Sequence, residues 1–120
     1  MDFKKLANQY RDELLDNVLP FWLEHSQDGE YGGYFKVFDT DKFIWLQGRE
    51  VWMFSMLYNK VEKRQEWLDC AVQGGEFLKK YGHDGNYNWY FSLDRSGRPL
   101  VEPYNIFSYT FATMAFGQLS

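Results

Sequence analysis

The sequence predicts an all-α protein built from stacked helical hairpins, as in an α/α barrel. Apolar residues recur with a helical period in four segments of the chain. A Gly/Tyr-rich loop sequence occurs twice, at residues 28–35 and 84–91, with five of eight positions identical. Each copy follows an amphipathic segment and precedes a more apolar one, which is the order of outer and inner helices in a toroid. A helical solenoid is the alternative with the same repeat.

The first predicted helix covers residues 2–25, with Asp2 as its N-cap and an apolar stripe that starts at Phe3. Pro20 is expected to kink this helix or to begin a second short one. His25 falls at the C-terminal end, where a cation suits the helix dipole. After the glycine-rich loop, residues 44–59 are predicted to form the second helix.

The third helix is predicted at residues 64–81, with Gly82 as the residue that ends it. A short β-hairpin is expected at residues 88–93 and 98–101, since a turn sequence separates them. The fourth helix begins near residue 105 and is apolar on nearly all sides, so it needs partners on several sides. An apolar helix in this position suggests the N-terminal part of a longer barrel domain or a chain that assembles with others.

Composition restricts the class of function. Aromatic residues make up 21% of the chain, and such side chains often line sites that stack sugar rings. The net charge of −4 disfavours nucleic-acid binding. The single cysteine, Cys70, fits a reducing cytoplasm, and we see no signal peptide and no membrane-spanning stretch. The sequence shows no His/Cys spacing typical of a metal site.

One face of the second helix carries the strongest candidate site. Helical spacing places Trp45, Arg49, Trp52 and Met56 together. A guanidinium between two indoles can stack on them and still donate to an oxyanion. An arginine that reaches from a core helix to water would show the same spacing.

At this point the sequence resembles the N-acylglucosamine 2-epimerase family. The resemblance rests on Asp-Gly-Glu-Tyr-Gly-Gly-Tyr-Phe (28–35), on Asp-Thr-Asp-Lys-Phe-Ile-Trp-Leu-Gln-Gly-Arg-Glu-Val-Trp (39–52) and on Pro-Tyr-Asn-Ile-Phe-Ser-Tyr-Thr-Phe-Ala (103–112). It covers essentially the whole chain but only about the first third of the family's usual length. The segment between Phe35 and Asp39 is shorter than the family's pattern. The central motif is closer to the N-acetylglucosamine epimerases than to the disaccharide epimerases.

The resemblance implies an (α/α)6 barrel that interconverts N-acetylglucosamine and N-acetylmannosamine by removal and return of the C2 proton. An arginine matching Arg49 would stabilise the enediolate. The family's catalytic histidines lie later in its chain, and neither His25 nor His83 matches one of those catalytic positions. We therefore expect residues 1–120 to be inactive alone. The resemblance also implies no required cofactor or metal, a nucleotide such as ATP as a possible effector, an amino-sugar ligand and a homodimer.

Further substrate-binding candidates lie near Arg49 or at the start of the fourth helix. Trp45 and Trp52 would serve as stacking walls or as packing, and Gln47 would bond a sugar hydroxyl or cap the helix. The fourth helix offers three more, which are Tyr104, Ser108 and Phe111.

Two other functions remain open from the residues alone. A glycoside hydrolase or lyase on the same toroid would need facing carboxylates, for which Asp39, Asp41 and Glu50 are the candidates, although a solvated helix N-terminus explains these residues equally well. A non-catalytic module would use the aromatic face to bind a sugar or a protein.

Overall fold

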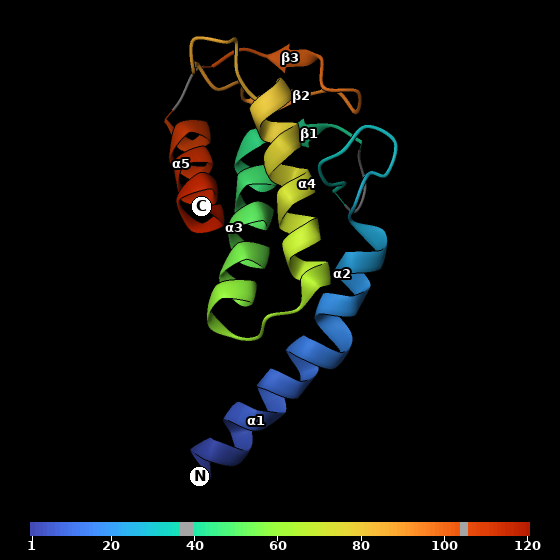
Figure 1. Cartoon of the computed structure of the whole chain (residues 1–120), viewed down its shortest axis with the longest axis vertical. Helices are drawn as coiled ribbons and strands as arrows, with labels where there is room; N and C mark the ends of the chain where they lie inside the picture. The colour runs from blue at the N-terminus through green and yellow to red at the C-terminus, as the bar shows by residue number, and fades with distance from the viewer. Residues whose placement is uncertain (37–39, 104–105) are drawn as a thin grey trace.

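A computed structural model describes residues 1–36, 40–103 and 106–120. Three helices stand side by side beneath a small sheet, and a long N-terminal helical segment projects from the opposite end (Figure 1). The helical elements are α1 (Phe3–Glu13), the π-helical turn η1 (Leu14–Val18), α2 (Leu19–His25), α3 (Ile44–Lys60), α4 (Gln65–Tyr81) and α5 (Phe107–Leu119). The described chain is mostly helical with one small sheet, which confirms the predicted fold class.

The N-terminal segment is one helix interrupted before Pro20. Asp2 caps it as predicted, since its carboxylate accepts from the backbone N–H of Lys5 at 3.1 Å. Proline has no N–H to donate and its ring crowds the carbonyl four residues earlier, so the helix widens into a π turn before α2 begins. Leu15 and Leu19 are buried, while Phe3 and Tyr10 are 74% and 70% exposed. The predicted apolar stripe is therefore largely uncovered.

Helices α3 and α4 form an antiparallel pair, and α5 packs on the other side of α3 (Figure 1). Gly48 permits this second contact, because a Cβ there would lie 2.8 Å from the backbone oxygen of Phe111. Helix α5 begins two residues later than predicted. Only Ser108, Ala112 and Ala115 of this helix are buried, while Phe107, Tyr109 and Met114 are 61%, 37% and 40% exposed.

The sheet extends the predicted hairpin by one strand. Strands β2 (Ser92–Leu93) and β3 (Pro99–Val101) form the hairpin, and β1 (Lys42–Phe43) adds antiparallel to β2, with Lys42 opposite Leu93. Strand β1 was not predicted, because a two-residue strand carries no periodic pattern in the sequence. The added strand joins the start of α3 to the loop that follows α4.

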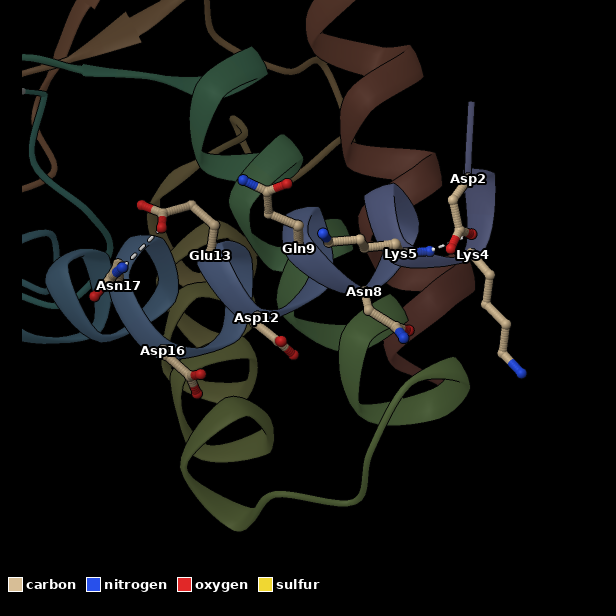
Figure 2. A pocket seen from close by; sticks show the side chains of 9 residues that line it. All are labelled: Asp2, Lys4, Lys5, Asn8, Gln9, Asp12, Glu13, Asp16 and Asn17. Carbon is tan, nitrogen blue, oxygen red and sulfur yellow. Dashed lines mark hydrogen bonds between the residues drawn. The ribbon is translucent and has the colours of Figure 1, made fainter.

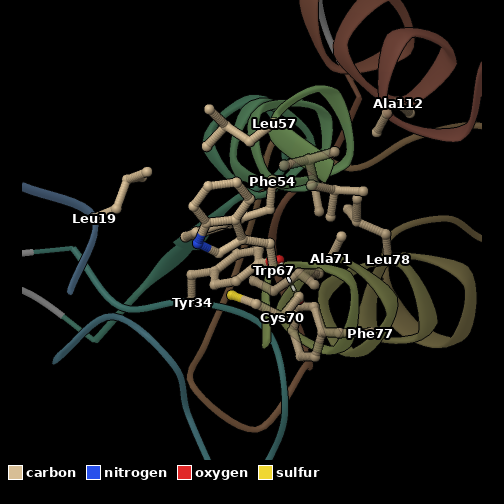
Figure 3. Packing of buried hydrophobic residues seen from close by; sticks show 14 of the residues in the cluster. Leu19, Tyr34, Phe54, Leu57, Trp67, Cys70, Ala71, Phe77, Leu78 and Ala112 are labelled. Carbon is tan, nitrogen blue, oxygen red and sulfur yellow. Dashed lines mark hydrogen bonds between the residues drawn. The ribbon is translucent and has the colours of Figure 1, made fainter. Parts of the chain in front are cut away.

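The core fills the space between α3, α4 and the first glycine-rich loop (Figure 3). Tyr34 is fully buried, stacks with Phe54 at 6.4 Å and donates its hydroxyl to the Cys70 carbonyl at 2.6 Å. Gly74 leaves room for this tyrosine, since a Cβ there would overlap its ring. Burial raises the pKa of the Cys70 thiol to about 12, so the reactive thiolate form is disfavoured at neutral pH.

Gly82 ends α4 for a different reason than the one predicted. Its φ is −71°, so it does not use the left-handed conformation of a typical glycine stop. A Cβ there would lie 2.6 Å from the Leu78 oxygen and 2.8 Å from the Trp89 ring. Glycine is needed at this position because Trp89 packs against the backbone.

Candidate active site

A buried ionic cluster fixes the chain just before α3. Lys42 is fully buried, and its ammonium lies 2.8 Å from Asp28 Oδ2, 2.6 Å from the Gly32 carbonyl and 2.8 Å from the Arg95 carbonyl. All three ammonium protons are thereby used. Burial lowers the pKa of Lys42, while Asp28 opposes that shift. We call Asp28, Lys42 and Arg95 the Asp28 cluster.

Arg95 completes this cluster from the turn between β2 and β3. Its Nε and Nη2 lie 3.1 and 3.2 Å from the two oxygens of Asp28, and the same side chain pairs with Glu30 at 3.0 Å. Burial would raise the pKa of Asp28, but the hydrogen bonds from Arg95 and Lys42 hold it well below its usual range. The cluster therefore joins the first glycine-rich loop and the β2–β3 turn to Lys42, just before α3.

Two glutamine side chains hold the first loop against the helices. The Gln47 amide bonds both the N–H and the carbonyl of Tyr34, at 2.7 and 2.8 Å. The Gln73 amide likewise bonds both backbone groups of Gly33, at 2.8 and 3.2 Å. Gln47 is fully buried, so the structure gives this predicted sugar-binding residue a loop-holding role.

Next to Lys42 and Gln47 in sequence, one face of α3 lines a hollow of about 400 Å³. We call it the Arg49 hollow, and its lining residues are Trp22, Leu46, Arg49, Glu50, Trp52 and Met53. Trp22 comes from α2 and the others from α3, so the hollow lies where these two helices meet. Its volume is within the range of small-molecule sites.

Arg49 is exposed at this hollow, and among the described residues no carboxylate pairs with it. The predicted neighbour Trp52 shares the hollow. A guanidinium not neutralised by an acid keeps its donors available for an anionic group. The arrangement therefore offers a positive charge beside apolar walls.

Glu50 provides the only carboxylate among the described residues that line the hollow. Its Oε2 is buried without a hydrogen-bond partner in the described parts of the chain, and the same holds for the Ser26 hydroxyl nearby. Burial raises the pKa of Glu50 to about 7, with Ser26 opposing the shift. A carboxyl group in a concave site whose pKa is shifted toward 7 is typical of functional sites.

The other predicted site residues lie elsewhere. Trp45 packs at 6.1 Å from the Phe111 ring, so both belong to the contact between α3 and α5. Ser108 is buried in the first turn of α5. Tyr104 lies outside the described residues, as does Asp39. Asp41, half-buried ahead of β1, does not line the Arg49 hollow.

Neither histidine shares the hollow with Arg49. His25 is exposed at the end of α2, with its ring 4.7 Å from that of Phe21. His83 accepts from the Gly85 N–H at 3.0 Å and lines a separate hollow of about 630 Å³ between α4 and α5. The described residues thus bring a cation and one acid together without an imidazole.

A hollow of about 890 Å³ along α1 lacks the chemistry of a sugar site (Figure 2). Its lining is polar throughout and comes from the N-terminal helix alone; the residues are Asp2, Lys4, Lys5, Asn8, Gln9, Asp12, Glu13, Asp16 and Asn17. No aromatic wall is present for a sugar ring to stack on. In the described parts of the chain, no group of three His, Cys, Asp or Glu side chains is arranged to hold a metal ion.

Helical spacing contained a signal for Leu46 and Met53, which were not predicted as site residues, and for Glu50, which was predicted only as a hydrolase carboxylate. Positions 46, 50 and 53 follow a helix face next to that of Arg49. Leu46, Glu50 and Met53 therefore form the second half of the hollow. Trp22 could not be assigned in advance, because its contact depends on how α2 crosses α3. No helix within the described residues is long and apolar enough to cross a bilayer.

Comparison with known sequences places this site in context. A sequence model described as N-acylglucosamine 2-epimerase (GlcNAc 2-epimerase) matches residues 36–120. The N-acylglucosamine 2-epimerase of Mus musculus is 44% identical over 119 residues, which cover 90% of this chain and 28% of that protein. The cellobiose 2-epimerase of Dictyoglomus turgidum is 29% identical over 120 residues, covering 92% of this chain and 30% of that protein.

A solved structure gives the same picture of the fold. The crystal structure of a sugar epimerase from a ruminal bacterium superposes with a TM-score of 0.86 at 28% identity, over 95% of this chain and 31% of that one. Such epimerases are α/α barrels, which agrees with the predicted architecture. The chain spans less than a third of the length of these relatives.

Proposed function

Because this chain belongs to the N-acylglucosamine 2-epimerase family, we propose that the whole protein is a sugar 2-epimerase that interconverts N-acetylglucosamine and N-acetylmannosamine. The observation that carries the proposal is Arg49, whose guanidinium faces a partly apolar hollow and has no carboxylate paired with it among the described residues. The higher identity to the N-acylglucosamine enzymes than to the cellobiose enzymes supports the choice of substrate. Cys70, the only cysteine and a buried thiol, suits a cytoplasmic protein.

The proposed reaction requires the C2 proton to leave an open-chain sugar and to return on the other face. Removal of that proton moves negative charge onto the neighbouring oxygen. Arg49 would stabilise this oxyanion with fixed N–H donors, an effect that is strong where walls such as Trp52 exclude water. The acid–base groups would come from residues outside this chain, since neither His25 nor His83 lines the hollow. Residues 1–120 would therefore be inactive alone.

The experiment follows the C2 proton by NMR during incubation of the whole protein with N-acetylmannosamine in heavy water. We expect exchange of C2 hydrogen for deuterium and formation of N-acetylglucosamine. Arg49→Lys and Arg49→Ala should lower kcat by about 10²–10³-fold, the usual effect of losing one oxyanion donor. Arg11→Lys, on the exposed helix α1, is the matched control, and its kcat should equal that of the parent. Unchanged exchange in Arg49→Ala would refute the role of Arg49, and absence of exchange in the parent would refute the function.

A hydrolase is less well supported by the same geometry. Retaining and inverting glycosidases both need two facing carboxylates. Among the described residues, the Arg49 hollow contains Glu50 and no second acid. Hydrolysis of a glycoside that is abolished by Glu50→Gln but unaffected by Arg49→Ala would favour that function instead.

A further inference from the structure

The start of α3 is held on two sides by contacts that leave Arg49 on a third side. Gln47 faces the first glycine-rich loop, and Gly48 packs against the backbone of Phe111 in α5. An α-helix turns by about 100° per residue, so Arg49 lies about 200° around the helix axis from Gln47. Gln47 is accordingly buried, while Arg49 is exposed at its hollow. The contact of Gln47 therefore controls how α3 is rotated about its axis, and with it the direction of Arg49.

The hydrogen bonds of Gln47 fix this rotation more firmly than a single contact would. Its side-chain amide accepts from the N–H of Tyr34 at 2.7 Å and donates to the carbonyl of the same residue at 2.8 Å. Hydrogen bonds are directional, so two of them from one planar group restrict its orientation as well as its distance. Because the amide is buried, a shift that broke either bond would leave a polar group without a partner.

The loop that Gln47 binds is itself fixed on α4. Tyr34 is fully buried, and its hydroxyl donates to the Cys70 carbonyl at 2.6 Å (Figure 3). Gln73 of α4 bonds both backbone groups of Gly33, at 2.8 and 3.2 Å. A Cβ on Gly33 would lie 2.6 Å from Gln47 Oε1, so the loop backbone lies directly against the amide. The loop therefore gives α3 a fixed point of attachment that does not move along with this helix.

We propose that Gln47 is a positioning residue for the reaction, which acts by directing the Arg49 guanidinium and not by touching the sugar. The inference rests on the proposed epimerase function and adds to it the residue that holds Arg49 where the oxyanion forms. An oxyanion donor acts only at a well-defined place, since a misplacement of about 1 Å can cost about 100-fold in rate. Gln47 is fully buried and does not line the Arg49 hollow, so its amide makes no bond to a ligand there.

The test is a double-mutant cycle between Gln47 and Arg49 in the whole protein, measured as C2 deuterium incorporation into N-acetylmannosamine. Gln47→Met removes both hydrogen bonds at similar side-chain volume and should lower kcat by about 10–100-fold, with KM within about threefold of the parent. In the Arg49→Ala background, the same substitution should lower the residual kcat by less than about threefold, because no guanidinium remains to be misplaced. Rates are expressed per folded protein, with the folded fraction taken from circular dichroism.

Gln73→Met is the matched control, because Gln73 holds the same loop by the same kind of paired bonds but belongs to α4. Any loss of kcat in this variant should be equally large in the parent and in the Arg49→Ala background. Gln47→Glu keeps an acceptor for the Tyr34 N–H and gives a second cycle that does not depend on the folding of Gln47→Met. It should likewise lower kcat only when Arg49 is present.

Three outcomes would overturn the positioning role. A loss in Gln47→Met that is equally large with and without Arg49 would mean that Gln47 supports the fold alone. A raised KM with unchanged kcat would mean that Gln47 binds the sugar, and an unchanged kcat and KM would mean that Arg49 is directed by other contacts. All three leave the epimerase function standing, whereas absence of C2 exchange in the parent would refute the function itself.

Discussion

The loop at residues 28–35 and the loop at residues 84–91 begin with the same Asp-Gly pair but differ in what surrounds the aspartate. In both loops, the aspartate side chain accepts hydrogen bonds from backbone N–H groups two to four residues later. An antiparallel β-bridge spans each loop, between Gln27 and Tyr34 in the first and between His83 and Trp89 in the second. Asp28 is 2% exposed and is held by Lys42 and Arg95. Asp84 is exposed and pairs with the Asn88 amide.

The basic residues decide this difference. Arg98 follows Asp84 at the same separation in sequence as Lys42 follows Asp28, yet it pairs with Asp94 at 2.8 Å. Lys42 is turned inward because β1 adds to the sheet and places it over the first loop. The same local sequence thus forms a buried connection in one unit and a surface turn in the other. The first unit is the one whose helix carries Arg49.

Breaking the buried connection should have the largest effect on stability. Lys42→Met would leave the Asp28 carboxylate buried with Arg95 as its only cation, and we expect the free energy of unfolding to fall by about 3–5 kcal/mol. Arg98→Met removes an exposed partner in the second unit and should change stability little. Urea unfolding of both variants measures the contrast. Equal destabilisation by the two substitutions would contradict the distinction between the loops.

The next largest effect should be a pH dependence of the free energy of unfolding, caused by Glu50 in α3. The folded-state pKa of Glu50 is about 7, raised above its ordinary value of 4.5. The neutral form is therefore favoured by folding, and its contribution is fully present below about pH 4.5 and lost as the pH rises through about 7. The loss should not exceed about 3 kcal/mol.

Unfolding measured between pH 4.5 and pH 8 in the parent and in Glu50→Gln tests this effect. The glutamine cannot ionise, so its stability curve should be flatter across that range. An unchanged slope in Glu50→Gln would mean that Glu50 is not the group that titrates.

The smallest effect should separate the glycines of the two inner helices. Gly48→Ala would force α3 away from the Phe111 backbone, and we expect a loss of about 1–3 kcal/mol. Gly117 in α5 has nothing within 4 Å of an added Cβ, so Gly117→Ala should stabilise by about 0.4–1 kcal/mol through reduced freedom of the unfolded chain. Thermal unfolding gives both values, and stabilisation by Gly48→Ala would contradict the close helix contact.

The sequence predicted what depends on local pattern. Helical periodicity located α3 and α4 to within a residue or two, and the repeated loop sequence indicated the order of outer and inner helices. Helical spacing also brought Arg49 and Trp52 to one hollow. These features follow from the 3.6-residue period, which is visible in any short window.

Contacts between distant segments were not predictable in this way. Arg95 reaches Asp28 across 67 residues, and no local pattern marks that pairing. Gln47 reads as a polar residue on a helix, and only the position of the first loop shows that its amide is used by Tyr34. The raised pKa of Glu50 likewise depends on burial, which its position in the helix does not show. Tertiary placement, which sequence spacing does not contain, decides each of these roles.

The most direct test of the role of Arg49 is chemical rescue of Arg49→Ala by guanidinium ion in the whole protein. The variant leaves a space at the rim of the hollow, and a free guanidinium of the same charge and shape can occupy it. We predict that C2 deuterium incorporation into N-acetylmannosamine, lost in Arg49→Ala, returns as millimolar guanidinium is added, with no such gain in the parent. A variant that stays inactive at every guanidinium concentration, although folded and still able to bind the sugar, would contradict the electrostatic role of Arg49.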